Sequence, residues 1–385
     1  MILIKNGQIK TMAGPDIERG EILIGDDGKI AAVGKKVKAP AGAQIIDAGG
    51  RLVTPGCIEA HCHVGMKGEA IRWEGIDHNE VSDPVTPQMR AIDGIRPQDE
   101  DFANAIRSGV TAACTGPGSA NVVGGTFVAI KLSGDRVDDM VIKNPVAMKC
   151  AFGENPKDFY GQNGKKAPVT RMGVAAMLRE LLFKTKRYIE KKESGKEPEF
   201  DIKLEAMIPV LKKEIPLKAH AHRADDVLTS IRIAKEFGVN LTLDHCTEGA
   251  AIAEILGKEG YPALVGPSLG YKSKIELKSR SFDTAGILYR AGVPISIVTD
   301  SPVIPIQYLP LCAGLAVSAG LPMEEGWRAV TINPAKHTGI DDRVGSLEVG
   351  KDADIVIWTA DPLVYVGGEA YITIVDGKIV WQKEA

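Results

Sequence analysis

Apolar and polar positions alternate in one way at the two ends of the chain and in another way between them. Residues 1–55 contain short apolar segments separated by glycine turns, including Asn-Gly and Asp-Gly pairs. Residues 345–385 repeat this pattern and contain a further Asp-Gly pair. Short alternating segments joined by such turns predict β-hairpins. Because chain ends often lie close together, we expect the two stretches to form one small β-sandwich domain.

Residues 56–344 alternate short apolar segments with amphipathic ones. Strands separated by helices predict βα units, a parallel sheet and an α/β fold, and the stretch can close into a (β/α)8 TIM barrel of about 250 residues. GTFVAIKLSG, residues 125–134, is the candidate for an eighth strand. Residues 171–216 predict a long helical connection that either covers the site or lies outside it. Seven other segments fit short buried strands: GCIEAHCHV, GVTAACTG, PVAMKCAFG, PLKAHAH, VNLTLDHC, YPALVGP and VPISIVTD.

The charge balance excludes two classes of partner. The chain of 385 residues has 47 Lys and Arg against 50 Asp and Glu, a formal net charge of −3. This balance predicts no basic surface for nucleic acid or for an anionic membrane. No apolar stretch is long enough to cross a bilayer. We therefore expect a small-molecule substrate, with no nucleic-acid and no membrane partner.

Six cysteines are scattered along the chain without Cys-x-x-Cys pairs. In a chain of this length, such spacing indicates reduced thiols rather than a disulfide framework. We expect the cysteines to be small buried side chains. Reduced thiols also predict a cytoplasmic location.

Five of the seven histidines fall at the ends of predicted strands, where a parallel barrel places its active site. His61 and His63 are two residues apart, so both side chains point to one face of a strand and can bind one or two divalent ions. His220 and His222 form a second pair of this kind. His245 lies at the end of the following strand.

Asp300 closes the apolar strand VPISIV. A buried carboxylate needs a partner, and a metal-bound water is one; a role as the cap of the next helix is the alternative. With the histidines, Asp300 completes a series of metal-binding side chains on successive strand ends. The chain has no Gly-x-x-x-x-Gly-Lys-Ser/Thr loop, so a phosphate-binding loop of this kind is not indicated.

In order and context, these residues resemble the amidohydrolase superfamily, in the branch that contains imidazolonepropionase. Three stretches carry the resemblance: LVTPGCIEAHCHVG, GVTAACTGPG and TINPAKHTGIDDRVGSLEVGKDADIVIW. The resemblance implies a hydrolase that acts on carbon–nitrogen bonds other than peptide bonds. It also implies a barrel, residues 56–344, that carries a small β-domain built from residues 1–55 plus 345–385.

The resemblance further implies roles for individual residues. His61 and His63 would hold one metal ion together with Asp300, and His220 and His245 would hold a second. The resemblance favours His220 over the neighbouring histidine as the ligand. The number of ions, one or two per chain, stays open. Zinc is the expected ion, with manganese or iron as alternatives.

Family members with two ions usually bridge them with a carboxylated lysine or a glutamate. Lys149 lies on an otherwise apolar strand and is the favoured bridge, because carboxylation would turn a costly buried amine into an anionic ligand. Glu154, five residues further on, is the alternative bridge, or a contact for the substrate. His222 and Arg223 would lie at the rim and recognise a substrate carboxylate or carbonyl, although a surface position is the alternative for His222.

We expect cleavage of an amide-like C–N bond in a cyclic amide, an acylated amino acid or a small peptide. A divalent ion lowers the pKa of bound water to about 7, which gives a metal-activated hydroxide near neutral pH. Asp300 would act as the general base and pass the proton to the leaving nitrogen. His78 and His337 have no motif around them, so structural or exposed positions are expected for both.

Two other functions stay open. A mononuclear amino-heterocycle deaminase on the same fold would use His61, His63, His220 and Asp300, with Lys149 unmodified. A non-catalytic scaffold is disfavoured, because every expected ligand position is filled. A homo-oligomer would be ordinary for the family.

Overall fold

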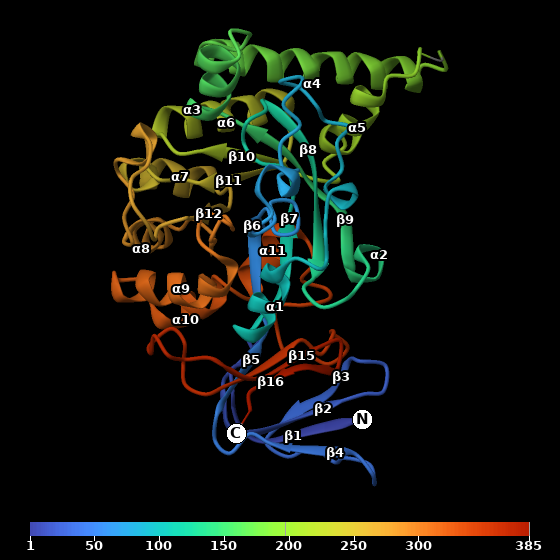
Figure 1. Ribbon diagram of the computed structural model, residues 1–385, viewed down its shortest axis with the longest axis vertical. Coiled ribbons are helices and arrows are strands. Elements are labelled where there is room, and N and C mark those ends of the chain that lie inside the picture. Colours follow the sequence, from blue (N-terminus) through green and yellow to red (C-terminus); the bar gives the residue numbers. More distant parts are fainter. Residues whose placement is uncertain (197, 385) are drawn as a thin grey trace.

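The computed structural model describes residues 1–196 and 198–384 (Figure 1). A small β-sheet contains the strands nearest both ends of the chain and lies in the lower part of the view. A larger barrel of strands with helices around it lies above this sheet. The chain therefore leaves the small sheet, builds the barrel and returns to the same sheet.

Eight strands from the two ends form one hydrogen-bonded sheet in the order β16-β15-β14-β5-β1-β2-β3, with β4 paired to β1. The two ends meet where β14 runs antiparallel to β5, with Val356 opposite Thr54. Isoleucines from both ends, including Ile4 and Ile374, share one core. The predicted association of the ends is therefore present, while sandwich stacking and the domain boundaries stay predictions. The strands are β1 (Ile2–Ile9), β2 (Ile17–Ile24), β3 (Ile30–Gly34), β4 (Gln44–Asp47), β5 (Leu52–Pro55), β14 (Ile355–Trp358), β15 (Ala370–Val375) and β16 (Lys378–Gln382).

A second sheet of eight strands, in the order β13-β12-β11-β10-β9-β8-β7-β6, forms the near-closed barrel. Where its two edges meet, the amide of His63 donates a hydrogen bond of 2.8 Å to the carbonyl of Ser301. Every residue of β6, β7, β10 and β11 is buried, as expected for barrel strands covered by helices. The strands are β6 (Cys57–Cys62), β7 (Val110–Thr115), β8 (Val123–Lys131), β9 (Val141–Ala151), β10 (Leu217–Ala221), β11 (Leu241–His245), β12 (Ala263–Val265) and β13 (Ile295–Ile297).

One strand departs from the predicted repeat of parallel βα units. The segment GTFVAIKLSG does contain a barrel strand, β8, but β8 runs antiparallel to both β7 and β9. Parallel neighbours need a crossover of a dozen or more residues. Only residues 116–122 separate β7 from β8, and only the short helix α2 (Val137–Met140) lies between β8 and β9. The predicted parallel direction is therefore wrong for this strand.

The helical connection predicted for residues 171–216 consists of α4 and α5, which pack against each other. Figure 1 shows α4 along the top of the molecule, and it also contacts α6. Of the two predicted alternatives, the connection lies outside the site rather than over it, because no residue of α4 or α5 lines the pocket described below. The helices are α1 (Glu100–Arg107), α3 (Glu154–Pro156), α4 (Arg171–Glu193), α5 (Ile202–Leu211), α6 (Ala224–Phe237), α7 (Ala253–Glu259), α8 (Thr284–Arg290), α9 (Leu309–Ser318), α10 (Met323–Arg328) and α11 (Ile332–Thr338).

The cysteines and the helices agree with two further expectations. All six cysteines are buried and have free thiols, as their spacing predicted. Within residues 1–196 and 198–384, we find no helix with the length and apolar character that a membrane crossing requires.

Candidate metal centre

The strand ends at one mouth of the barrel bring the predicted ligands together. His61 lies in β6, Lys149 in β9, His220 in β10 and His245 at the end of β11, while Asp300 follows β13 by three residues. These five strands point the same way, so their carboxyl ends meet at one mouth. The lysine and the three histidines are buried, and Asp300 is nearly so. Residues more than two hundred positions apart in sequence thus form one polar cluster.

Asp300 faces both histidines of β6. Its Oδ1 atom lies 3.2 Å from Nε2 of His63 and 3.5 Å from Nε2 of His61. The Nζ atom of Lys149 lies 3.2 Å from the same nitrogen of His61. Oδ1 of Asp300 is buried and makes no well-formed hydrogen bond to any described residue. A buried carboxylate oxygen beside two imidazole nitrogens is a donor set that suits a divalent ion.

His220, His222 and His245 form a second group, in which one ligand atom from each residue lies within 4.8 Å of the others. The rings of His222 and His245 stack, with centroids 4.7 Å apart. His222 is therefore part of the centre rather than a surface residue. His245 also forms a group with His61 and Asp300, whose ligand atoms again lie within 4.8 Å of one another. His245 therefore belongs to both candidate ion positions.

Hydrogen bonds behind the rings determine which nitrogen faces the centre. Nδ1 of His63 donates to the carbonyl of Gly116, and Nδ1 of His245 donates to the carbonyl of Gly266, both at 2.7 Å. Each bond leaves Nε2 with a free lone pair, the arrangement found around metal-bound histidines. Nε2 of His245 is buried and has no partner among the described residues. Since buried polar atoms are normally paired, the donor set fits a bound divalent ion.

The backbone is strained at two of these residues. His245 has φ 78° and Asp300 has φ 56°, in the left-handed region that residues other than glycine seldom occupy. Such conformations cost about 1–3 kcal/mol each and concentrate at functional sites. The fold therefore holds these two side chains in place at the expense of stability.

Burial lowers the pKa of all four imidazoles that face one another in the centre. The shift applies to His61, His220, His222 and His245, and desolvation is its largest cause in each. These side chains are consequently neutral at pH 7. The neutral ring is the form that binds a metal ion.

Asp300 and Lys149 respond differently to burial. Burial by itself would raise the pKa of Asp300, but the close approach of His63 and of the other imidazoles outweighs burial and lowers this pKa. Burial lowers the pKa of Lys149 to about 8, against the opposing effect of Asp244. A carboxylate that stays ionised and an amine of lowered pKa thus both approach Nε2 of His61.

Two charged residues behind the centre were missed by the sequence analysis. Oδ2 of Asp244 lies 2.8 Å from Nδ1 of His61 and 4.0 Å from Nζ of Lys149. Oδ1 of Asp244 accepts a hydrogen bond of 3.2 Å from Lys218. Both residues interrupt apolar strands, which is the signal that identified Lys149 and could have identified them. A carboxylate behind a metal-binding histidine orients the ring.

Glu276 also lies at the centre, although no sequence motif marks it. It is buried in the loop after β12, with Oε1 at 3.8 Å from Nε2 of His220 and 3.9 Å from Nε2 of His222. Lys274 approaches the same oxygen to 2.9 Å. Glu276 belongs to a helical turn of three residues, which is too short to show a periodic pattern, so only the folded chain reveals this contact.

Two residues assigned to the site lie away from the histidines. The carboxylate of Glu154 faces the backbone amide of Glu276 at 3.4 Å and belongs to neither group of ligands. Arg223 pairs with Asp225 through two hydrogen bonds of 2.9 Å and is 40% exposed. Neither side chain belongs to the two groups of candidate ligands, so the roles of Glu154 and Arg223 stay predictions.

A pocket of about 320 Å³ opens onto the centre. His63, His220, His222 and Asp300 line it, so these side chains can contact a small molecule. His78, for which the sequence suggested a structural or exposed position, lines it as well, with its ring centroid 5.4 Å from that of His63.

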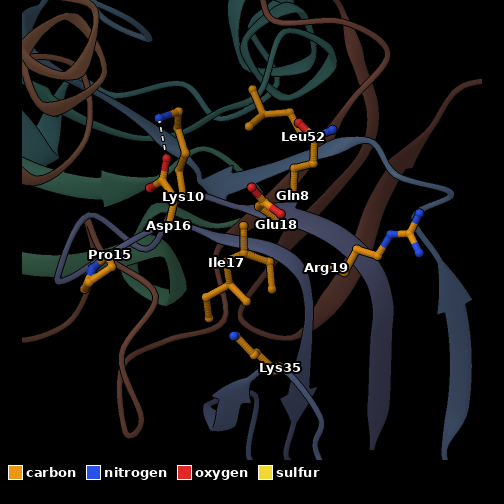
Figure 2. Close-up of a pocket in the computed structure, with 10 residues that line it drawn as sticks. Gln8, Lys10, Pro15, Asp16, Ile17, Glu18, Arg19, Lys35 and Leu52 are labelled. Atoms are coloured by element: carbon orange, nitrogen blue, oxygen red, sulfur yellow. Dashed lines mark hydrogen bonds and ion pairs between the residues drawn. The ribbon is translucent and has the colours of Figure 1, made fainter.

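A larger pocket of about 1140 Å³ lies against the terminal sheet and has a different chemistry (Figure 2). Residues of β1 and β2 and the turn between them line it, including Lys10, which pairs with Asp16 at 2.8 Å. Acidic and basic side chains are mixed there, and none of the residues assigned to the site lines it. The smaller pocket is therefore the candidate site, because several of the predicted metal ligands line it and none of them lines the larger pocket.

Known proteins resemble this chain over its whole length. A family model described as the amidohydrolase family matches residues 204–380. An amidohydrolase from Thermotoga maritima MSB8 has a crystal structure with a TM-score of 0.95 and 40% identity, covering 100% of both chains. Imidazolonepropionase from Klebsiella pneumoniae (strain 342) is 24% identical over 96% of this chain and 95% of its own. The amidohydrolase tasK of Hapsidospora irregularis is 30% identical over 89% of this chain. The chain spans only 38% of the length of that longer protein.

Proposed function

The chain belongs to the amidohydrolase superfamily, in the group related to imidazolonepropionase, and from this premise we propose that it is a metal-dependent hydrolase of amide-like C–N bonds. One observation carries the proposal. Nε2 of His245 is buried without a partner among the described residues, and His245 belongs to both groups of ligands. The proposed substrates are small molecules: cyclic amides, acylated amino acids or small peptides.

The proposed ligands of the first ion are His61, His63 and Asp300, supported by their mutual approach within 3.5 Å around Oδ1 of Asp300. His220 and His245 are the proposed ligands of a second ion, with His222 beside them. Zinc is the ion that a set dominated by imidazoles suits best, while manganese and iron accept similar sets.

We further propose that Lys149 is carboxylated and bridges the two ions. Lys149 is fully buried, and its Nζ atom lies 3.2 Å from a ring nitrogen of His61. Carboxylation requires a neutral amine, and burial lowers the pKa of Lys149 to about 8, which keeps part of the population neutral near pH 7.

When bound, the divalent ion supplies a Lewis acid and a water of lowered pKa. Asp300 accepts a proton from the attacking water, because its lowered pKa keeps it ionised and its side chain lines the pocket. The oxygen of that water adds to the carbonyl carbon, the C–N bond breaks, and the proton passes from Asp300 to the departing nitrogen. A carboxylate of low pKa is a weak base, so this step depends on an acidified water.

A mononuclear deaminase is the second candidate, and one contact favours it. Oδ2 of Asp244 lies 4.0 Å from Nζ of Lys149, so a protonated, unmodified lysine would have a counter-charge. His61, His63, His220 and Asp300 would then share one ion. Release of ammonia from amino-heterocycles distinguishes this activity from hydrolysis of amides.

Metal content tests the proposal directly. The protein is purified without chelator, and its ions per chain are measured by mass spectrometry, with His337→Asn as a control histidine outside the centre. About two ions in both proteins, together with acid and amine released from an amide panel, is the expected result. One ion with release of ammonia would favour the deaminase. No ion after reconstitution with zinc or manganese would overturn the metal-dependent function.

Two wider expectations remain part of the proposal. Residues 1–55 plus 345–385 and residues 56–344 are proposed as separate domains, since each has its own sheet. A cytoplasmic location is proposed on the six free, buried thiols.

A further inference from the structure

Two cationic side chains line the pocket without a carboxylate partner. Lys67 follows β6 and Arg280 follows β12, and both line the pocket that Asp300 lines. Lys274, the third cation there, is paired with Glu276 at 2.9 Å. Within the described part of the chain, no carboxylate lies within 4.0 Å of a charged nitrogen of Lys67 or Arg280.

Arg280 has an unfilled donor inside the protein. One terminal nitrogen, Nη1, donates to the carbonyl of Tyr271 at 3.0 Å, while Nε is buried and has no acceptor among the described residues. Burial lowers the pKa of the guanidinium, and the charge of Asp300 only partly opposes this. Buried donors without acceptors are rare in native proteins, and one on the wall of a catalytic pocket indicates a missing ligand.

We propose that Arg280 anchors a carboxylate of the substrate, so that the pocket takes acylated amino acids or short peptides whose free carboxylate lies near the scissile C–N bond. The proposal rests on the hydrolase function above and narrows its substrate class. A guanidinium offers a fork of donors that matches the two oxygens of a carboxylate. Lys67 adds a second positive charge to the same pocket.

The position of Arg280 fits this role better than that of Arg223. The sequence had placed recognition of a carboxylate at Arg223, but Asp225 already occupies that guanidinium. Arg280 lies in the loop after β12, which is next to β13 and therefore to Asp300, the proposed base. A carboxylate bound there holds the amide close to the base. The pocket volume of about 320 Å³ restricts the substrate to a small molecule.

Matched pairs of ligands test the anchor. The twenty N-acetyl amino acids and their twenty carboxamides are titrated calorimetrically into the metal-loaded wild-type enzyme and three variants. Arg280→Met removes the charge, Arg280→Lys keeps it without the fork, and Lys278→Met is the control. Lys278 lies in the same loop, is 72% exposed and does not line the pocket.

In the wild type and in Lys278→Met, at least one free acid is expected to bind about tenfold to a hundredfold more tightly than its carboxamide, as charge-assisted hydrogen bonds predict. Arg280→Met should abolish this preference, and Arg280→Lys should retain only part of it. A wild type that prefers no acid, or an Arg280→Met variant that keeps the preference, would overturn the anchor. The comparison of acids with carboxamides in the wild type tests the anchor even if a variant does not fold.

Failure of the anchor and failure of the hydrolase function give different results. If amides are hydrolysed but acids and carboxamides bind equally, Arg280 is not the anchor and the hydrolase function stands. If acids bind through Arg280 while no C–N bond is cleaved, the anchor stands and the hydrolase function fails. For a substrate that is cleaved, Arg280→Met should raise KM for the acid much more than it lowers kcat.

Discussion

The amine nitrogen of Lys149 lies 3.2 Å from Nε2 of His61, and both side chains are fully buried. An amine so placed either donates to the ring as an ammonium group or becomes an anionic ligand through carboxylation. In the proposed function, the chemical state of Lys149 distinguishes a centre with two ions from a centre with one.

Replacing Lys149 by alanine should reduce the metal content from about two ions per chain to about one. The reason is the loss of the proposed bridging ligand, and mass spectrometry of the purified protein measures it. Lys149→Glu restores an anion and should hold more metal than Lys149→Ala. Lys184→Ala, an exposed lysine, serves as the control. Equal metal content in wild type and Lys149→Ala would refute the bridge.

Asp300 and His61 should separate catalysis from metal binding. Asp300→Asn keeps a side-chain oxygen for the proposed ion but removes the proposed base, so we expect the metal to stay and turnover to fall by about 10²–10⁴-fold. His61→Ala should instead lower the metal content. Near-normal turnover in Asp300→Asn, or unchanged metal content in His61→Ala, would contradict these roles. Both variants are compared by metal analysis and steady-state kinetics.

Lys131 of β8 should be important for stability. Its Nζ atom is buried between Asp352 at 3.1 Å and Asp354 at 2.7 Å, next to the terminal sheet. Lys131→Met leaves the buried carboxylate of Asp354 without its cation and should cost about 3–5 kcal/mol, measured by denaturant unfolding. Adding Asp354→Asn to Lys131→Met should recover part of the loss. A change within about 0.5 kcal/mol, the range for surface substitutions, would show that the cluster contributes little.

His337 should make the protein less stable at acidic pH. Nδ1 of His337 lies 2.8 Å from the hydroxyl oxygen of Ser296, and burial lowers the pKa of His337 from 6.5 to about 4. Between these values the unfolded chain binds a proton that the folded chain does not, so stability falls as pH decreases, by at most about 1.4 kcal/mol per pH unit. His337→Asn should show a shallower decrease between pH 6.5 and 4 than the wild type. Parallel stability curves for the two proteins would refute this contribution.

The sequence predicted the barrel strands because each is an apolar run bounded by turn residues. It did not predict the direction of β8, since the residues of a buried strand do not encode which way the strand runs. The brevity of residues 116–122 was the available signal, because such a loop cannot hold a crossover helix. The helices α4 and α5 were predictable from their charge pattern, but their position outside the pocket was not.

The candidate site was predictable where its residues follow strands. His61 and His245 stand out as polar residues at the ends of apolar strands, and the barrel brings such ends together. Glu276 and Arg280 lie between β12 and α8, outside the barrel strands, where residue spacing does not predict which way a side chain points. The role of Arg223 stays a prediction, and no sequence motif indicated that its guanidinium pairs with Asp225, two residues away.

The pairing of β5 with β14 has a consequence for synthesis of the chain. Val356 is about 300 residues later than its partner Thr54. At about 5–20 residues per second, β5 leaves the ribosome roughly 15–60 s before β14 is made. During this interval one edge of the terminal sheet stays open, and open edges recruit strands from other molecules. The nascent chain is therefore most exposed to aggregation while the barrel is being made, and a chaperone that covers the β5 edge would act in that interval.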